Sequence, residues 1–273
     1  MRTACFPPRR ADARATGRTQ LTTVLIGPLL AVLLLVLAGA AALTVGLMEL
    51  GRPRDTVIAA ARAIVQLAAV SLVIGYVLRS LWLTTAFLTL MVLVGGATSA
   101  KRITGSLRLR SWWAVVPILS GLVPTLTLIL ASTAVPLHPV AVLPSAGILI
   151  GGAMTATSLA GRRTADELAV RRGEYEAALS IGLPRRDAVI LVARPAAALA
   201  LIPGMDQTRT VGLVTLPGAF VGVLLAGASP WQAGVTQVLV LLALLLVQAI
   251  AVAVTVELIA AGLLPAGALV LPE

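Results

Sequence analysis

The stretch QAGVTQVLVLLALLLVQAIAVAVTVELIA, residues 232–260, carries a single charged side chain, Glu257. It is long enough to cross the hydrocarbon core of a bilayer as an α-helix, which takes about 20 apolar residues. Its apolar residues form a continuous block, whereas the strands of a membrane β-barrel alternate apolar and polar positions. The stretch therefore predicts a membrane-spanning helix and indicates the fold class of the chain.

The remaining sequence has the same character. Hydrophobic residues make up 59% of the 273 positions, charged residues 12%, and the mean hydropathy is +1.01, whereas a soluble domain is about 25% charged. We expect an all-α integral membrane protein of about seven transmembrane helices. One transmembrane domain covers residues 21–260, between a basic, disordered extension at 1–20 and a C-terminal tail at 261–273. The predicted spans are residues 22–47, 56–78, 82–100, 112–133, 140–160, 210–227 and 232–260.

Two segments between the fifth and sixth predicted spans differ from the rest. The first, GRRTADELAVRRGEYEAALSIGLPRRDAV at 161–189, holds six arginines and five acidic residues. The second, ILVARPAAALALIPGMDQTRT at 190–210, is interrupted by Pro195 and Pro203. We interpret the second as an interfacial or bundle-packed helix that leads to the sixth span.

Basic residues indicate the orientation. With the predicted spans, fourteen lysines and arginines from Arg52 to Arg209 fall on one side of the membrane, and Arg79 falls on the other. Because the positive side of a membrane protein faces the cytoplasm, the 161–189 loop and the C-terminus are expected to be cytoplasmic in a multi-pass plasma-membrane protein. The N-terminus, with five arginines before residue 20, would then lie outside. A secretory signal and an over-extended start remain alternatives for that region.

Several protein classes are excluded or disfavoured. The clustering of arginines at the ends of apolar blocks argues against a nucleic-acid partner. One cysteine, Cys5, cannot build a disulfide or a thiolate metal site within one chain. The sequence has no GxxxxGK[ST] phosphate loop and no HExxH or GxSxG motif. We therefore expect no ATP hydrolysis by this chain and disfavour an intramembrane hydrolase.

The 161–189 loop contains signals for short helices. Thr164 followed by Glu167 fits a capping box, and Gly173 suggests two helical pieces rather than one. The second piece, EYEAALSIG, ends at Gly182, a left-handed terminator before Pro184. Its small apolar face is expected to dock into a groove on another protein; the alternative is a solvated or membrane-surface loop. That face comprises Tyr175, Ala178 and Leu179.

Three stretches resemble the FetB-type (YbbM-type) permeases of ABC transporters. ALIPGMDQTRTVGLVTLPGAFVGVLLAGASPWQAGVTQ, residues 200–237, is similar to the longest element of that family. ARAIVQLAAVSLVIGYVL at 61–78 resembles its second span, and LPSAGILIGGAMTATSL at 143–159 its fifth. EAALSIG at 176–182 matches the EAA-xxx-G element of ABC permeases. The resemblance covers roughly residues 45–260 in the same order.

The resemblance implies the membrane subunit of an ABC transporter that exports iron or another metal. The chain would form a homodimer in the lipid bilayer and pair with a separate ATPase subunit. ATP and Mg would bind that subunit, and this chain would hold no cofactor and perform no catalysis. The 161–189 loop would couple the two subunits. The coupling residues would be Glu174, Tyr175, Glu176, Ala177, Ala178 and Gly182.

The substrate is less well indicated. The family's PGMM reads PGAF here, Pro217 to Phe220, so both methionines are missing. The family's GNAM reads GGAM, Gly151 to Met154, without the amide. Thioethers and amide carbonyls are plausible metal contacts, so these departures weaken the assignment of iron and leave metal ligands unknown. His138, between two prolines, is expected to be structural.

Polar or helix-breaking residues in spans are candidates for a translocation pathway, because polar groups are costly in lipid. Gln237 shares a helical face with Gln248, whereas Glu257 lies on the opposite side and is expected to be solvated. Arg62 could instead snorkel to the surface, and Asp206 with Arg209 could simply stabilise a turn. Pro217 would break a helix, and Gly218 with Gly222 has GxxxG spacing. The candidate pathway residues are Arg62, Gln66, Thr210, Pro217, Gly218, Gly222 and Gln237.

A secondary transporter or channel that needs no ATPase is the alternative function. It would not require the charged EAA loop.

Overall fold

The computed structural model describes residues 27–265, which divide into two units at Leu72. The predictions for residues 1–20 and for most of the C-terminal tail lie outside the described residues. Within them, seven helices or stacked helical segments are long and apolar enough to cross a membrane, and no β-strand is formed between residues 27 and 265. The all-α fold class is confirmed.

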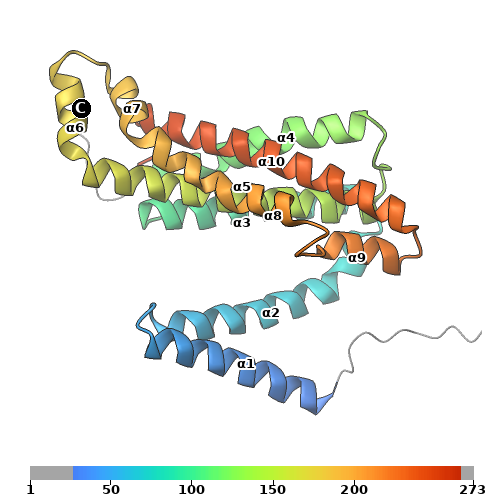
Figure 1. Cartoon of the computed structure of the whole chain (residues 1–273). Coiled ribbons are helices and arrows are strands. Elements are labelled where there is room, and N and C mark those ends of the chain that lie inside the picture. Colours follow the sequence, from blue (N-terminus) through green and yellow to red (C-terminus); the bar gives the residue numbers. More distant parts are fainter. Residues whose placement is uncertain (1–26, 266–273) are drawn as a thin grey trace, which may run out of the picture. The chain divides into compact units, whose positions relative to one another are not determined.

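The first unit contains α1 (Pro28–Leu47) and most of α2 (Pro53–Val77), joined by a short turn (Figure 1). Proline at the first turn of each helix is tolerated because that turn has no intrahelical acceptor for an amide hydrogen. A Cβ added at Gly46 would lie 2.8 Å from the ring of Pro53, so glycine lets the chain turn back closely. Within this unit, α1 and α2 bury few of their side chains against each other.

The second unit holds the remaining helices. Ser80 caps α3 by accepting a hydrogen bond from the Trp82 amide, and Ser229 with Gln232 forms a capping box at α10. The elements are α3 (Leu81–Thr104), η1 (Leu109–Ala114), α4 (Val115–Ala131), α5 (Pro139–Val170), α6 (Arg172–Ser180), α7 (Arg185–Ala198), η2 (Leu199–Leu201), α8 (Ile202–Thr210), α9 (Gly218–Leu225) and α10 (Pro230–Ala260).

Helices α5 and α10 form the centre of the second unit. α5 packs against α3, α4, α7 and α10, and α10 also packs against α4, α7 and α9. Small residues allow these close contacts: a Cβ added at Gly121 of α4 would lie 2.6 Å from the carbonyl oxygen of Val247 on α10. Ser158 of α5 donates a 3.0 Å hydrogen bond to Ser99 of α3. Close packing and polar bridges of this kind are the usual basis of helix association in membranes.

The sixth span differs from the prediction. Residues 185–210 form one apolar rod of α7, η2 and α8, which packs against α5 and α10. A 3₁₀ turn at Leu199–Leu201 precedes Pro203, which stands in the first turn of α8, where its missing amide hydrogen costs little. The predicted span at 210–227 is wrong: Gly212 has φ +82°, and only the eight residues of α9 are helical.

Candidate coupling site

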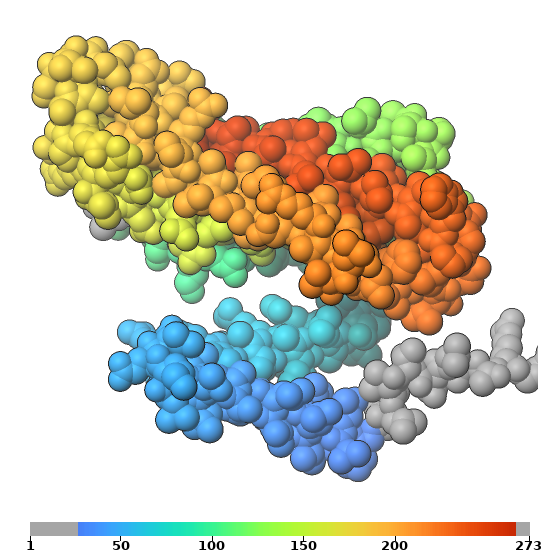
Figure 2. Space-filling model, viewed as in Figure 1, coloured from blue at the N-terminus to red at the C-terminus, as the bar shows by residue number. Residues whose placement is uncertain are grey.

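Helix α6 projects from one end of the second unit, at a sharp angle to α5 (Figures 1 and 2). The chain breaks at Arg171, which has φ −101° and ψ 33° between the two helices. The sequence predicted two helical pieces here, and the structure confirms two. The break lies at Arg171 rather than at Gly173, and the predicted start at Thr164 is wrong. Thr164 is fully buried inside the continuous helix α5, which extends to Val170.

The end of α6 is the one that the sequence predicts. Gly182 has φ +90°, the left-handed conformation that glycine adopts without steric cost. Its amide donates to the carbonyl of Leu179 at 2.9 Å, and the amide of Leu183 donates to the carbonyl of Ala178 at 3.1 Å. This pair of bonds is a Schellman motif. Pro184 then caps α7, so the chain reverses direction within a few residues.

The apolar face of α6 packs inward, contrary to its expected docking into another protein. Tyr175 is 1% exposed and Ala178 5% exposed. Both belong to a core cluster that includes Ile103 of α3, Leu168 of α5 and Val189 of α7. The face was identified correctly from its spacing, but its partner is the rest of the chain. Tyr175 and Ala178 therefore hold α6 against the rest of the chain.

The outer face of α6 carries the remaining predicted residues. Glu174, Glu176, Ala177 and Gly182 are all exposed. Two aliphatic side chains flank this face, Val170 at 84% and Ile181 at 79% exposure. Neither residue was predicted from the sequence, although an aliphatic residue next to a predicted helix terminator is a recognisable signal. These six exposed residues, called the α6 outer face below, are small, aliphatic or acidic, and exposed side chains of this kind are suited to contact with another protein.

Ion pairs fix the charged side chains of this region. Arg171 donates hydrogen bonds to Glu174, and its Nη1 lies 3.4 Å from Glu167 Oε1. Arg172 Nε lies 2.8 Å from Glu176 Oε1. The hydrogen bond from Arg171 is the main reason that the pKa of Glu174 is lowered, and the same bond raises the pKa of Arg171. All of these groups are substantially exposed, so they contribute little to overall stability.

The start of α7 is tied to the end of α10. Arg186 donates to both carboxylate oxygens of Glu257, at 2.9 and 2.6 Å. A Cβ added at Gly262 would lie 3.4 Å from Arg185 Nη2, so this guanidinium lies against the turn after α10. Glu257 is about half exposed, which confirms its expected solvation. A displacement of α6 would therefore reach α5, α7 and α10 together.

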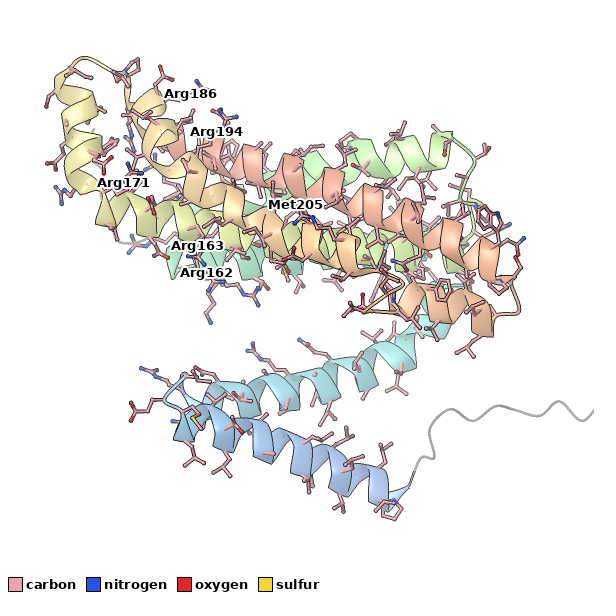
Figure 3. All side chains as sticks on the ribbon, viewed as in Figure 1. Arg162, Arg163, Arg171, Arg186, Arg194 and Met205 are labelled. Carbon is pink, nitrogen blue, oxygen red and sulfur yellow. The ribbon has the colours of Figure 1, made fainter. Side chains whose placement is uncertain are left out.

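Basic residues of the second unit gather at the α6 end. Arg162, Arg163, Arg171 and Arg186 lie there, whereas Arg194 stands further along α7 (Figure 3). Helices α3, α5 and α7 begin or end in the core cluster beneath α6, so ten basic residues fall at this end. They are Lys101, Arg102, Arg108, Arg110, Arg162, Arg163, Arg171, Arg172, Arg185 and Arg186. Arg79 and Arg209 belong to the opposite end. Arg79 precedes α3, whose far end carries Lys101 and Arg102, and Arg209 ends the rod that begins at Arg185.

That position of Arg209 corrects the predicted location of its neighbours. Arg209 was counted among the basic residues on the cytoplasmic side, and Asp206, Thr208 and Thr210 lie within three residues of it. They instead end the α7–α8 rod, a full span away from α6. Arg209 Nη1 lies 3.5 Å from Asp206 Oδ1, the exposed ion pair that the turn interpretation expected.

The candidate pathway residues are divided between the two units of the described chain. Pro217 caps α9, and Gly218 and Gly222 lie within it. A Cβ added at either glycine would meet no atom within 4 Å, so their GxxxG spacing supports no close helix contact inside this chain. Arg62 and Gln66 are exposed on α2 in the first unit.

The two glutamines of α10 are buried on one face, as their spacing predicted. Gln237 is 5% and Gln248 8% exposed, and neither Oε1 has a hydrogen-bond partner among residues 27–265. A Cβ added at Gly204 of α8 would lie 2.0 Å from Gln248 Oε1. Unpaired buried amides inside a membrane bundle are costly, which makes Gln237 and Gln248 candidate functional residues. No group of three or more His, Cys, Asp or Glu side chains that could hold a metal occurs in the described residues.

Comparisons with known proteins agree on a family. The family described as "Uncharacterised protein family (UPF0014)" matches residues 28–264. The UPF0014 membrane protein STAR2 of rice is 34% identical over 71% of this chain and 68% of its own length. Protein ALUMINUM SENSITIVE 3 of Arabidopsis is 31% identical over 68% of this chain and 69% of its own. The probable iron export permease protein FetB of Escherichia coli is 28% identical over 72% and 76%. No solved structure matches.

Proposed function

Because this chain belongs to the UPF0014 family of membrane proteins, we propose that it is the membrane subunit of an ABC transporter. In this proposal a separate ATPase binds the α6 outer face and drives export of a metal ion. The observation that carries the proposal is α6 itself. It is a short helix outside the apolar spans, with its inner face locked into the bundle and its outer face free.

The orientation follows from the charges. Ten of the basic residues of the second unit lie at the α6 end and two at the other. By the positive-inside rule, the α6 end and the end of α10 face the cytoplasm. An ATPase that uses cytoplasmic ATP would meet the chain there.

The packing of α6 suits it to transmit force. Its core contacts with α5 and α7, and the Arg186–Glu257 pair between α7 and α10, make these helices respond together. Closure of the ATPase subunits would then move three spans as a rigid body, the kind of switch that alternating access requires. Gln237 and Gln248 lie on one of those spans, α10, where their amides would meet a substrate.

The proposed substrate class rests on the relatives. The Escherichia coli relative is named a probable iron export permease. Since residues 27–265 hold no His, Cys, Asp or Glu cluster, a metal ion would pass by weak contacts with amide and backbone oxygens. Weak contacts are appropriate for a path that releases its ion.

The docking step is tested by replacing an outer-face residue. Ile181→Asp should abolish co-purification of the ATPase from native membranes, because it places a charge in an apolar contact. The chain has no phosphate loop, so Mg-dependent ATP hydrolysis in the eluate measures the bound ATPase. Leu213→Asp is the matched control, since Leu213 is 92% exposed at the opposite end. Equal hydrolysis in the wild type and both variants would refute docking at α6.

The substrate is tested separately in reconstituted vesicles that hold the whole complex. A transported metal should raise the rate of ATP hydrolysis, and Gln248→Leu should reduce that stimulation without removing the ATPase. If no metal changes the rate while docking is intact, metal export is wrong and the ABC assignment stands.

A further inference from the structure

A groove of about 510 Å³ lies between α7 and α10, away from the α6 outer face. Its walls are mainly small aliphatic side chains, among them Ala197, Val252, Ala253 and Val256. Both bordering helices belong to apolar segments long enough to cross a membrane. The groove therefore opens on a surface of spanning helices.

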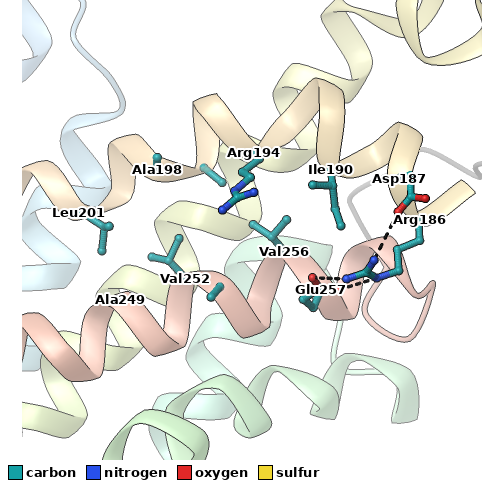
Figure 4. Close-up of a pocket in the computed structure, with 12 residues that line it drawn as sticks. Arg186, Asp187, Ile190, Arg194, Ala198, Leu201, Ala249, Val252, Val256 and Glu257 are labelled. Atoms are coloured by element: carbon teal, nitrogen blue, oxygen red, sulfur yellow. Dashed lines mark hydrogen bonds and ion pairs between the residues drawn. The ribbon is translucent and has the colours of Figure 1, made fainter. Parts of the chain in front are cut away.

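Two arginines line this groove, and only one of them is paired with acidic residues among residues 27–265. At its outer end Arg186 donates to both carboxylate oxygens of Glu257, and its Nη1 lies 3.3 Å from Asp187 Oδ1. Arg194 lies eight residues further along α7, about 12 Å deeper along the helix axis. It extends from α7 toward α10 (Figure 4), and it forms no ion pair or hydrogen bond with any side chain of residues 27–265. Both acidic residues of the lining are already engaged by Arg186.

A lone guanidinium at this depth is costly unless an anion accompanies it. Arginine within a spanning segment is rare, and it normally pairs with another group or reaches the headgroup region. The side chain of Arg194 is exposed in the isolated chain, so an external ligand can reach it. Phosphate suits a guanidinium well, because the two can form parallel charge-assisted hydrogen bonds.

We propose that this groove binds an acidic phospholipid of the leaflet at the α6 end. Arg194 holds the phosphate, and the small side chains of α7 and α10 hold the first carbons of an acyl chain. A lipid fits better than a soluble anion because the lining around Arg194 is apolar and lies within the spans. Basic pockets between spanning helices on the positively charged side are known to take acidic headgroups. This site is independent of the ATPase and of the transported substrate.

Native mass spectrometry of the full chain in detergent tests the proposal. Dioleoyl phosphatidylglycerol and dioleoyl phosphatidylcholine have the same acyl chains and differ in net charge. The wild type should retain about tenfold more of the acidic lipid, and Arg194→Gln should lower its binding to the level of the zwitterionic lipid. Arg194→Lys should retain an intermediate amount, because lysine keeps the charge without the planar fork.

Arg163→Gln is the matched control, because Arg163 is an exposed arginine at the same end that does not line the groove. This variant should bind the acidic lipid like the wild type. Equal binding of the two lipids by the wild type, or unchanged binding by Arg194→Gln, would overturn the proposal. Displacement of the acidic lipid by millimolar inorganic phosphate would show that the site takes a free anion, and this too would overturn the lipid assignment.

Discussion

The two ends of the second unit are built differently. At the α6 end, ten basic residues surround a short helix that is fixed by a buried tyrosine, a Schellman turn and ion pairs. At the opposite end, the eight residues of α9 follow a loop whose apolar side chains are exposed, such as Leu213 at 92% and Val214 at 77%. A charged, rigid end suits contact with water and a soluble protein, whereas an apolar, loosely packed end suits the membrane interface. The difference supports the proposal that an ATPase docks at the α6 end.

The largest expected effect compares an aromatic residue at each end. Tyr175→Ala should destabilise the chain by about 3–5 kcal/mol, because it removes a fully buried ring from the core beneath α6. Trp231→Ala should change stability by less than about 0.5 kcal/mol, since that side chain is 81% exposed. Thermal unfolding in detergent measures both.

Tyr175→Phe separates the ring from its hydroxyl. The hydroxyl has no hydrogen-bond partner among residues 27–265, so its removal should leave the melting temperature unchanged or raise it. A loss as large as that of Tyr175→Ala would mean that the α6 core depends on a polar contact and not on packing.

A smaller effect compares two glycines. Gly182→Ala should cost about 1 kcal/mol, because φ +90° is strained for any residue with a Cβ. Gly222→Ala should be neutral or stabilise by up to about 1 kcal/mol, since the site is helical and its surroundings are open. If Gly222→Ala also reduced transport in the folded complex, Pro217 to Gly222 would be supported as part of the pathway. A larger loss of stability in Gly222→Ala than in Gly182→Ala would contradict the difference described between the two ends.

The smallest expected effect concerns pH at α6. The lowered pKa of Glu174 means that its carboxylate adds stability above the pKa of about 4.3 of an unfolded glutamate, and that this contribution is lost as pH falls through the lowered pKa. Glu174→Gln should therefore melt slightly below the wild type at pH 7. The two melting temperatures should converge as pH falls through the lowered pKa of Glu174, and a difference that grows on acidification would contradict the Arg171–Glu174 pairing.

The sequence predicted the helical membrane class, six of the seven spans and the end of α6, because long apolar blocks and glycine terminators are local signals. It misplaced the sixth span because Pro195 and Pro203 read as interruptions, and only tertiary packing against α5 and α10 shows that the rod continues through them. The spacing of Tyr175, Ala178 and Leu179 predicted the apolar face of α6. Spacing alone cannot indicate whether that face packs against the same chain or against another protein. Arg194 was not singled out from the sequence, because its lack of an ion pair depends on Glu257, which is distant in sequence and already bound by Arg186.

The central claim is that the α6 end faces the cytoplasm. Its most direct test is labelling by a membrane-impermeant maleimide in a Cys5→Ser background, with a single cysteine at Ile181 or at Leu213. We predict that Ile181→Cys reacts only in inverted vesicles and Leu213→Cys only in intact cells. Labelling of Ile181→Cys from outside intact cells would contradict the orientation, and with it the ATPase contact proposed for α6.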